Sequence, residues 1–207
     1  MRTSRIAARR LRIMAGMPEH RFLVSGERAA LGSLEREHLA RLSRWFNDPE
    51  VRRGLAHRGI VNEDAETAWY ERMTAAAGEP RPTEVPFAIH DAADGELVGV
   101  CGLENIDHNF SRADFGIFLG QRRGAGIGAD ATRLVLDWAF TIIGLHNVML
   151  ESYEFNDQAI RAYERAGFQV IGRRRDAVRA LGRRWDSVLM DATAEGFYGS
   201  TRPRRIA

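Results

Sequence analysis

The sequence has no lysine among its 207 residues and a single cysteine, Cys101. Without lysine, neither a Walker phosphate-binding loop nor the Schiff base of pyridoxal chemistry can form. One cysteine excludes an internal disulfide and a cysteine-based metal cluster, and its place in the apolar run 98–103 favours a buried thiol over a nucleophile. No run of about 18 apolar residues occurs, so no transmembrane helix is expected.

The charge of the chain is unevenly distributed. Residues 1–17 hold five arginines and no acid, and residues 201–207 hold three arginines and no acid, although the formal net charge of the whole chain is only +2. The residues between these ends therefore carry a net negative charge, which favours a cationic substrate. Binding of nucleic acid through the basic ends is the weakest hypothesis, because no nucleic-acid-binding motif accompanies them.

The length and composition fit one globular domain. Apolar residues make up 44% of the chain and charged residues 28%, which is ordinary for a globular protein. We expect a basic N-terminal extension at residues 1–18, a single domain at 19–192 and a loose basic tail at 193–207. The N-terminus lacks the long apolar segment of a signal peptide, so we expect a cytoplasmic protein.

Hydrophobic periodicity and turn residues predict a mixed order of strands and helices. We expect one strand at 22–31 that is bulged at Gly26, and then helices at 34–46, from Pro49, and at 62–77. The later strands are expected at 87–91, 96–103, 112–119, 147–154, 168–175 and 185–191, and the later helices after the strand 112–119 and at 156–166. This order predicts a mixed α/β fold with helices on the faces of a sheet.

One stretch in the middle of the chain is suited to binding an anion. An apolar strand from Phe115 to Leu119 leads to Gly124, Gly126 and Gly128, after which a long amphipathic pattern begins. The free N–H groups and the dipole at a helix start attract negative charge, and glycines allow a phosphate to approach the backbone. The neighbouring arginines, Arg122 and Arg123, can add positive charge.

Two motifs together carry a family resemblance. The first is Q-x-x-G-x-G, from Gln121 to Gly126, and the second is N-x-x-A-x-x-x-Y-E-x-x-G-F, from Asn156 to Phe168. In this order the pair resembles the GCN5-related N-acetyltransferases (GNAT). The likeness is closer to the branch of ribosomal-protein N-terminal acetyltransferases and spermidine acetyltransferases, and it spans roughly residues 22–192.

The resemblance implies a mostly antiparallel central sheet flanked by helices, with a splay between the strands that end at Leu119 and Glu154. It implies acetyl-CoA as co-substrate, with its pyrophosphate on the backbone of the glycine loop and its pantetheine along the strand before it. The N–H near Phe118 would polarise the acetyl carbonyl. Asn156 would touch pantetheine or only cap its helix, and Arg161 would reach the 3′-phosphate or stay in solvent. The cofactor-binding candidates are Ile117, Phe118, Leu119, Arg123, Gly124, Ala125, Gly126, Ile127, Gly128, Ala129, Asn156 and Arg161.

Two catalytic residues follow from the chemistry of acetyl transfer. Tyr163 matches the family's tyrosine beside the coenzyme sulfur and would protonate the thiolate, because its ordinary pKa near 10 keeps it protonated at neutral pH; alternatively its ring only packs under the sheet. Among the acids on the central strands, Glu104 is the first choice for the base, acting directly or through water. Asp114, Glu151 and Glu154 remain alternatives.

We therefore expect an acetyl-CoA-dependent N-acetyltransferase that transfers an acetyl group directly to a primary amine in a ternary complex, without a metal. The amine belongs to a protein N-terminus or to a small molecule, and the sequence leaves this choice open. The alternative is an acyl-CoA-binding sensor or interaction module without robust turnover. The family likeness also suggests a homodimer, and nothing in the sequence suggests a membrane partner.

Overall fold

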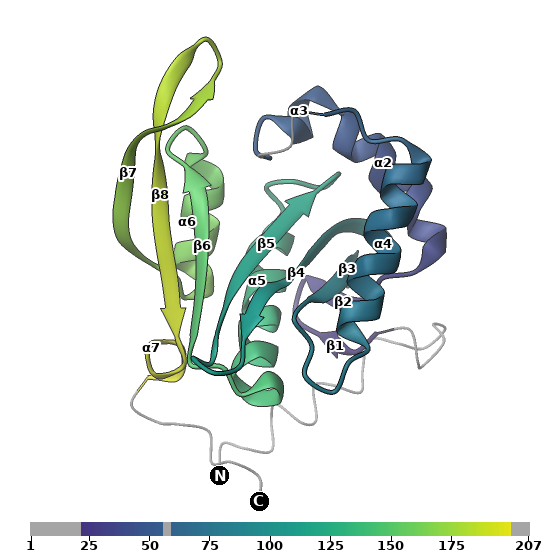
Figure 1. Cartoon of the computed structure of the whole chain (residues 1–207), viewed down its shortest axis with the longest axis horizontal. Helices are drawn as coiled ribbons and strands as arrows, with labels where there is room; N and C mark the ends of the chain where they lie inside the picture. The colour runs from purple at the N-terminus through teal and green to yellow at the C-terminus, as the bar shows by residue number, and fades with distance from the viewer. Residues whose placement is uncertain (1–21, 56–58, 200–207) are drawn as a thin grey trace, which may run out of the picture.

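The computed structural model describes residues 22–55 and 59–199 and contains one eight-stranded sheet in the order β1-β2-β3-β4-β5-β6-β8-β7 (Figure 1). Only the β5–β6 pair is parallel, so the predicted mixed, mostly antiparallel sheet is confirmed. The strands are β1 (Val24–Ser25), β2 (Ala29–Ser33), β3 (Val85–Asp91), β4 (Leu97–Asp107), β5 (Arg112–Leu119), β6 (Asn147–Tyr153), β7 (Gln169–Ala180) and β8 (Arg183–Thr193). The predicted extension 1–18 lies outside the described residues.

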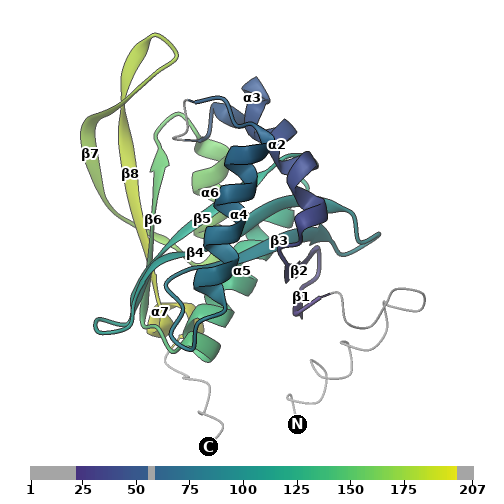
Figure 2. The ribbon, with the colours of Figure 1, turned by 45° about the vertical axis from the view of Figure 1, so that its right-hand side comes forward.

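Helices cover both faces of the sheet, with α2 and α4 on one face and α5 and α6 on the other (Figure 2). The helical elements are η1 (Arg36–His38), α2 (Leu39–Asn47), α3 (Pro49–Arg52), α4 (Glu63–Ala77), α5 (Ile127–Trp138), the π-helical η2 (Ala139–Ile143), α6 (Asp157–Ala166) and α7 (Ala194–Tyr198). The strand alternation divides the core between the faces: Leu103 and Phe115 belong to the α5–α6 side, whereas Val100 packs on the α2–α4 side with Phe118 at its margin.

The sheet opens between β5 and β6. Their parallel ladder contains Arg112↔Asn147, Ala113↔Val148 and Asp114↔Met149, and it ends there. Beyond this point the two strands diverge, because β4 holds β5 along its length while β8 holds β6 from Asn147 to Tyr153 (Figure 1). The predicted splay is therefore confirmed.

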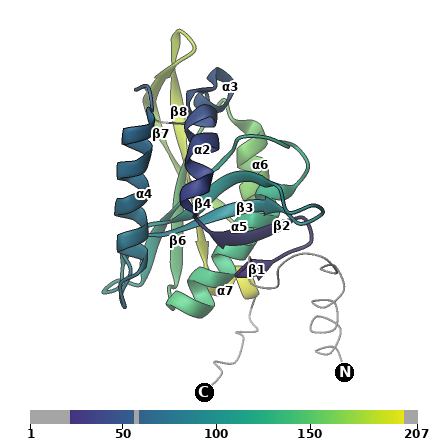
Figure 3. The ribbon, with the colours of Figure 1, turned by 90° about the vertical axis from the view of Figure 1, so that its right-hand side faces the viewer.

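The first predicted strand is a hairpin instead. Residues 22–31 form β1 and part of β2, which pair antiparallel, and Gly26 lies in the turn, where its N–H donates to the Ala29 carbonyl (2.8 Å). Asp130 in α5 accepts hydrogen bonds from the N–H groups of Arg28 (2.7 Å) and Ala29 (2.9 Å). Figure 3 shows this hairpin beside α5. A contact so distant in sequence leaves no local signal.

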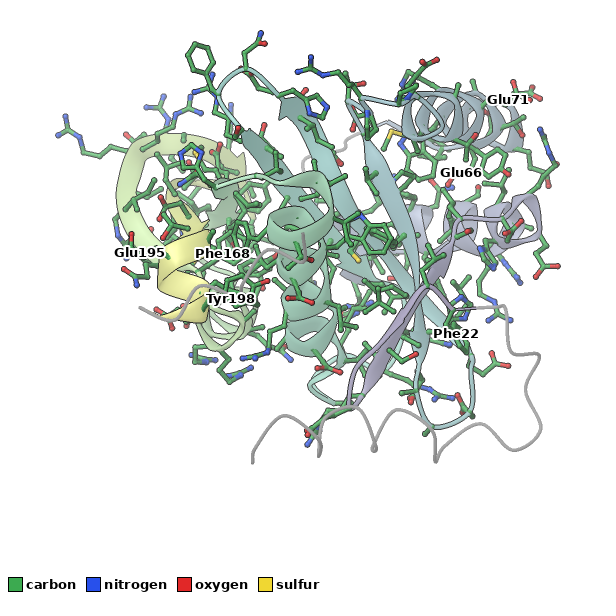
Figure 4. All side chains as sticks on the ribbon, turned by 90° about the horizontal axis from the view of Figure 1, so that it is seen from below. Phe22, Glu66, Glu71, Phe168, Glu195 and Tyr198 are labelled. Atoms are coloured by element: carbon green, nitrogen blue, oxygen red, sulfur yellow. The ribbon has the colours of Figure 1, made fainter. Side chains whose placement is uncertain are left out.

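The prediction of a loose tail from residue 193 is wrong for residues 193–199. Thr193 ends β8 and caps α7, since its hydroxyl accepts from the Gly196 N–H (3.0 Å). Phe197 packs against Phe140 with 5.6 Å between ring centroids, and the Tyr198 hydroxyl donates to Asp137 (Figure 4). Two aromatic residues are too few to show a helical period, so only the tertiary contacts reveal this helix. Residues 200–207 lie outside the described part.

Helix α4 buries an acid. Met73 is buried, but Ala65 is exposed, and the glutamate next to it, Glu66, is only 3% exposed. Figure 4 shows Glu66 on the side of α4 that faces α2, and Glu71 outside. Within the described residues, Glu66 Oε1 has no hydrogen-bond partner. Burial raises the pKa of Glu66 from 4.5 to about 7.

This burial predicts a pH-dependent stability. Between pH 4.5 and about 7 the folded state keeps a proton that the unfolded state has released, so the free energy of unfolding falls as the pH rises through this window. The shift corresponds to roughly 3 kcal/mol. We expect Glu66→Gln to match the wild type at pH 5 and to exceed its unfolding free energy at pH 8 by about 2–3 kcal/mol in urea titrations.

Glu71→Gln on the same helix is the control, because Glu71 is exposed and pairs with Arg36 at 3.0 Å. It should change stability by less than about 1 kcal/mol at either pH. If the free energy of unfolding depends on pH in the same way for the wild type and Glu66→Gln, burial does not raise the pKa of Glu66.

Candidate active site

The glycine loop between β5 and α5 has the geometry of an anion site. Gly124 and Gly126 adopt positive φ angles of +84° and +82°, which glycine reaches without strain. Gly126 is the N-cap of α5 and has no side chain with which to cap the helix. The amides of Ile127, Gly128 and Ala129 in the first turn are therefore available to an anion.

The arginine next to the loop holds it in place. We expected Arg122 to contribute charge to the anion, but its guanidinium donates to Asp91 and to Asp94 (Nη2–Oδ2 2.8 Å) in the β3–β4 turn. Gln121 donates to the Leu97 carbonyl (2.8 Å). These contacts tie the loop to the strands before it.

A second arginine, Arg28, supports the loop from the β1–β2 turn. Its Nη1 donates to the Ala125 carbonyl (2.6 Å), and its side chain lies against Gly126. On the other flank, Arg123 Nε donates to the Leu119 carbonyl (3.1 Å). The amides are thus oriented before any ligand arrives.

A cavity of about 540 Å³ runs from the loop into the gap between β5 and β6. Most of the predicted cofactor residues line it, together with Tyr163: Ile117, Phe118, Leu119, Arg123, Gly124, Gly126, Gly128, Ala129 and Asn156. The lining that the sequence did not predict comes mainly from α3 and α6: Glu50, Val51, Arg53, Gly54, Leu55, Phe155, Gln158, Ala159, Ala162, Arg165 and Leu181.

Three predicted cofactor residues do not line the cavity. The Ile127 side chain is buried in the core, although its amide lies at the helix start. The carbonyl of Ala125 accepts from Arg28. Arg161 is exposed, whereas Arg165, one turn further along α6, lines the cavity. The motif predicted the helix α6, but the rotation of α6 against β5 decides which of its arginines lines the cavity.

The register of β4 and β5 narrows the choice of oxyanion donor, which the sequence predicted to lie near Phe118. The Gly120 N–H donates to the Val98 carbonyl (2.9 Å), and bonded pairs alternate along an antiparallel ladder. The pair Val100↔Phe118 is therefore a hydrogen-bonded one, and the Phe118 N–H is taken by β4. The N–H groups of Ile117 and Leu119 point to the opposite side, into the gap.

Tyr163 and Asn156 both face this cavity from the α6 side. The Tyr163 ring packs edge-on against Phe115 and Phe168, with centroids 6.3 Å and 6.1 Å away, so it is both a core residue and a cavity residue. Burial raises its pKa to about 12, so the hydroxyl is protonated at neutral pH. Asn156 makes no side-chain cap bond, which removes the capping alternative.

Glu104 lies beside the cavity, on the sheet face covered by α4. It is paired with Asp114 across β4–β5, and its Oε1 lies over Gly116, 3.2 Å from where a Cβ would be. Gly116 and Phe118 are two residues apart, or about 7 Å along the strand. Desolvation and the charge of Asp114 raise the pKa of Glu104. The distance suits a relay through water.

The other candidate carboxylates each have a polar partner. Glu151 pairs with Arg174 (3.6 Å) and Glu154 with Arg173 (2.9 Å), so arginines on β7 neutralise both. Asp114 accepts a hydrogen bond from Asn105 Nδ2 (3.0 Å). Glu104 thus remains the first candidate for the base.

Neither a metal-binding cluster nor a membrane-spanning helix occurs in the part of the chain that the structure describes. No group of three or more His, Cys, Asp or Glu side chains is arranged so that it could hold a metal ion. In residues 22–55 and 59–199, no helix is long and apolar enough to cross a membrane.

A sheet that opens beside a glycine loop and a helix N-terminus defines the class of coenzyme A-dependent acyltransferases. The family model for the acetyltransferase (GNAT) domain matches residues 28–169. The chain therefore belongs to the GNAT family and is an acetyl-CoA-dependent N-acetyltransferase.

Individual relatives agree with this assignment. The chain is 25% identical over 174 residues to an uncharacterized N-acetyltransferase, p20, of Bacillus licheniformis, covering 84% of this chain and 97% of that protein. It is 35% identical over 80 residues to the spermidine N(1)-acetyltransferase of Escherichia coli (strain K12), covering 38% of this chain and 43% of that enzyme. A crystal structure of spermidine N-acetyltransferase from Vibrio cholerae in complex with CoA and spermine shares the fold, with a TM-score of 0.75 at 23% identity over 84% of this chain and all of that one (coverage 100%).

The geometry of the loop predicts the effect of a single methyl group. A Cβ on Gly126 would lie 3.1 Å from the Arg28 side chain, so Gly126→Ala should displace the contact that orients the amides. We expect acetyl-CoA affinity to fall at least about tenfold in isothermal titration.

Gly144→Ala is the matched control, because Gly144 has a φ of +81° and nothing lies within 4 Å of its Cβ position. Both variants lose about 1–2 kcal/mol of stability from the left-handed backbone, but only Gly126→Ala should lose affinity. An equal affinity for both variants would contradict the role of the loop.

Proposed function

We propose that the protein holds acetyl-CoA across the gap between β5 and β6 and transfers the acetyl group directly to a primary amine in a ternary complex. The observation that carries this proposal is that one continuous cavity joins the glycine loop, the unpaired edge of β5 and Tyr163. The pyrophosphate binds the amides of residues 123–129, with Arg123 and Arg165 adding positive charge.

Pantetheine then lies along β5 and replaces the strand that is missing there. Its amide groups pair with the backbone of Ile117 and Leu119, which face the gap. The same edge provides an N–H for the oxygen of the acetyl group, where negative charge develops during attack by the amine. Asn156 closes this path from the α6 side.

The protons move through two residues. The ammonium of the acceptor loses its proton through water to Glu104, and its nitrogen then forms a bond to the acetyl carbon. As the carbon–sulfur bond breaks, the thiolate takes a proton from the Tyr163 hydroxyl, and the second proton of the attacking nitrogen leaves through water and restores that hydroxyl, so that a neutral amide and the free thiol result. Both assignments are supported by the raised pKa values, since Glu104 becomes a stronger base and Tyr163 remains protonated.

Replacing the tyrosine separates binding from chemistry. We expect Tyr163→Phe to bind acetyl-CoA as the wild type does in isothermal titration, because the ring and its contacts remain. Its kcat across an amine panel should fall about a hundredfold, within the range for a lost general acid.

Tyr198→Phe is the control, since it also loses a tyrosine hydroxyl, here partly buried and bonded to Asp137, and Tyr198 does not line the cavity. It should keep its kcat. An unchanged kcat in Tyr163→Phe would refute the general-acid role. Wild-type binding of acetyl-CoA without turnover of any amine would instead favour an acyl-CoA sensor, and no binding would refute the proposed function.

The base assignment predicts a pH profile. Glu104 must be ionised to accept a proton, and its pKa lies above the ordinary glutamate value, so kcat/KM should decline toward acid pH at a higher pH than an ordinary glutamate would give. Glu104→Gln should lower kcat/KM about a hundredfold and remove this acidic limb. Glu154→Gln, which weakens the contacts of that side chain with Arg173 and the Asp186 N–H, should retain it. If the acidic limb of the pH profile persists in Glu104→Gln, another group is the base.

A further inference from the structure

A second cavity of about 330 Å³ adjoins the coenzyme cavity. One wall comes from α3 and the residues after it, with Arg52, Arg53 and Leu55, and the other from the β7–β8 hairpin, with Val178 and Leu181; Tyr153 at the end of β6 lies between them. Figure 1 shows α3 and the hairpin tip on either side of the gap. Because Arg53, Leu55 and Leu181 line both cavities, the second one opens toward the first.

The charge around this second cavity is positive. Its lining includes two arginines and no carboxylate. The hairpin segment 173–184 adds six arginines, of which Arg173, Arg174 and Arg184 are paired with Glu154, Glu151 and Asp176. Arg53 itself is 63% exposed and has a distant ion pair with Glu50 at 3.9 Å, so it is available to a ligand. The net negative charge of the domain favoured a cationic substrate, but the local charge favours the opposite sign.

The remaining lining is apolar. Leu55 and Val178 contribute aliphatic surface, and Leu181 projects from the hairpin turn with 60% of its surface exposed. A large exposed aliphatic side chain in a turn loses contact with water when a ligand covers it, which stabilises the complex. The second cavity thus offers a cationic group and an apolar wall to the same ligand.

Resting on the proposed acetyltransferase function, we propose that the acceptor amine also carries a carboxylate and an apolar body. The carboxylate pairs with Arg53, the apolar part lies against Leu55 and Leu181, and the amine points into the gap toward the thioester. A polyamine presents only positive charges to these arginines and is repelled. The specificity therefore differs from that of the spermidine acetyltransferases that share the fold.

The test compares acceptors that differ in one carboxylate. L-phenylalanine is paired with phenethylamine, an aspartate-containing peptide amide with its asparagine analogue, and spermidine stands as the polyamine. At saturating acetyl-CoA, kcat/KM should be at least about tenfold higher for the carboxylate-bearing member of one pair, and spermidine should be the poorest acceptor. The productive pair tells whether the carboxylate belongs to an amino acid or to a peptide.

Arg53→Glu should abolish or invert the preference within the productive pair; because Arg53 also lines the coenzyme cavity, the readout is the ratio of kcat/KM between the two members, which a common loss of coenzyme binding does not change. Arg81→Glu, an exposed arginine in the loop between α4 and β3, is the matched control and should keep the preference. Preferred acetylation of spermidine, or an equal loss for both members of the pair in Arg53→Glu, would overturn this inference while the acetyltransferase function stands. Failure to acetylate any amine would instead refute the proposed function.

Discussion

The structure depends on a parallel strand pair that stops after three residue pairs. Beyond these pairs β5 stays paired to β4 and β6 stays paired to β8, and the two strands diverge from each other. The N–H groups of Ile117 and Leu119 are left without strand partners, which is unfavourable in a protein interior unless water or a ligand satisfies them. An extended pantetheine arm with its own amides is suited to that edge. The gap therefore explains the cavity, the fit to coenzyme A and the position of Tyr163.

Several charged side chains near the glycine loop, Arg122, Arg28 and Asp130 among them, build its shape rather than bind its ligand. Arg122 holds the loop to Asp91 and Asp94, Arg28 holds it from the β1–β2 turn, and Asp130 fixes that turn to α5. The amides are oriented in advance, so less conformational entropy is lost when a pyrophosphate binds. This arrangement suits a chain without lysine, in which the anion site relies on backbone amides and a few arginines.

The sequence predicted features that local chemistry determines. Gly124, Gly126 and Tyr163 belong to motifs whose spacing fixes a turn or a helix face, and the structure brings them to one cavity. It did not predict features that depend on how distant segments meet. The register of β4 and β5 assigns the free N–H to Ile117 and Leu119 rather than Phe118, and the rotation of α6 selects Arg165 over Arg161. The second cavity joins residues 52–55 to the turn at Leu181, and no local pattern connects such segments.

The central claim is that the gap and the loop receive one coenzyme molecule. A crystal structure with bound acetyl-CoA tests it directly. The account predicts pyrophosphate oxygens within about 2.7–3.2 Å of the backbone N–H groups between residues 123 and 129, and pantetheine hydrogen-bonded to Ile117 or Leu119 in the gap. A coenzyme bound elsewhere, or a β5–β6 ladder that closes past Asp114 and Met149 and shuts the gap, would contradict it.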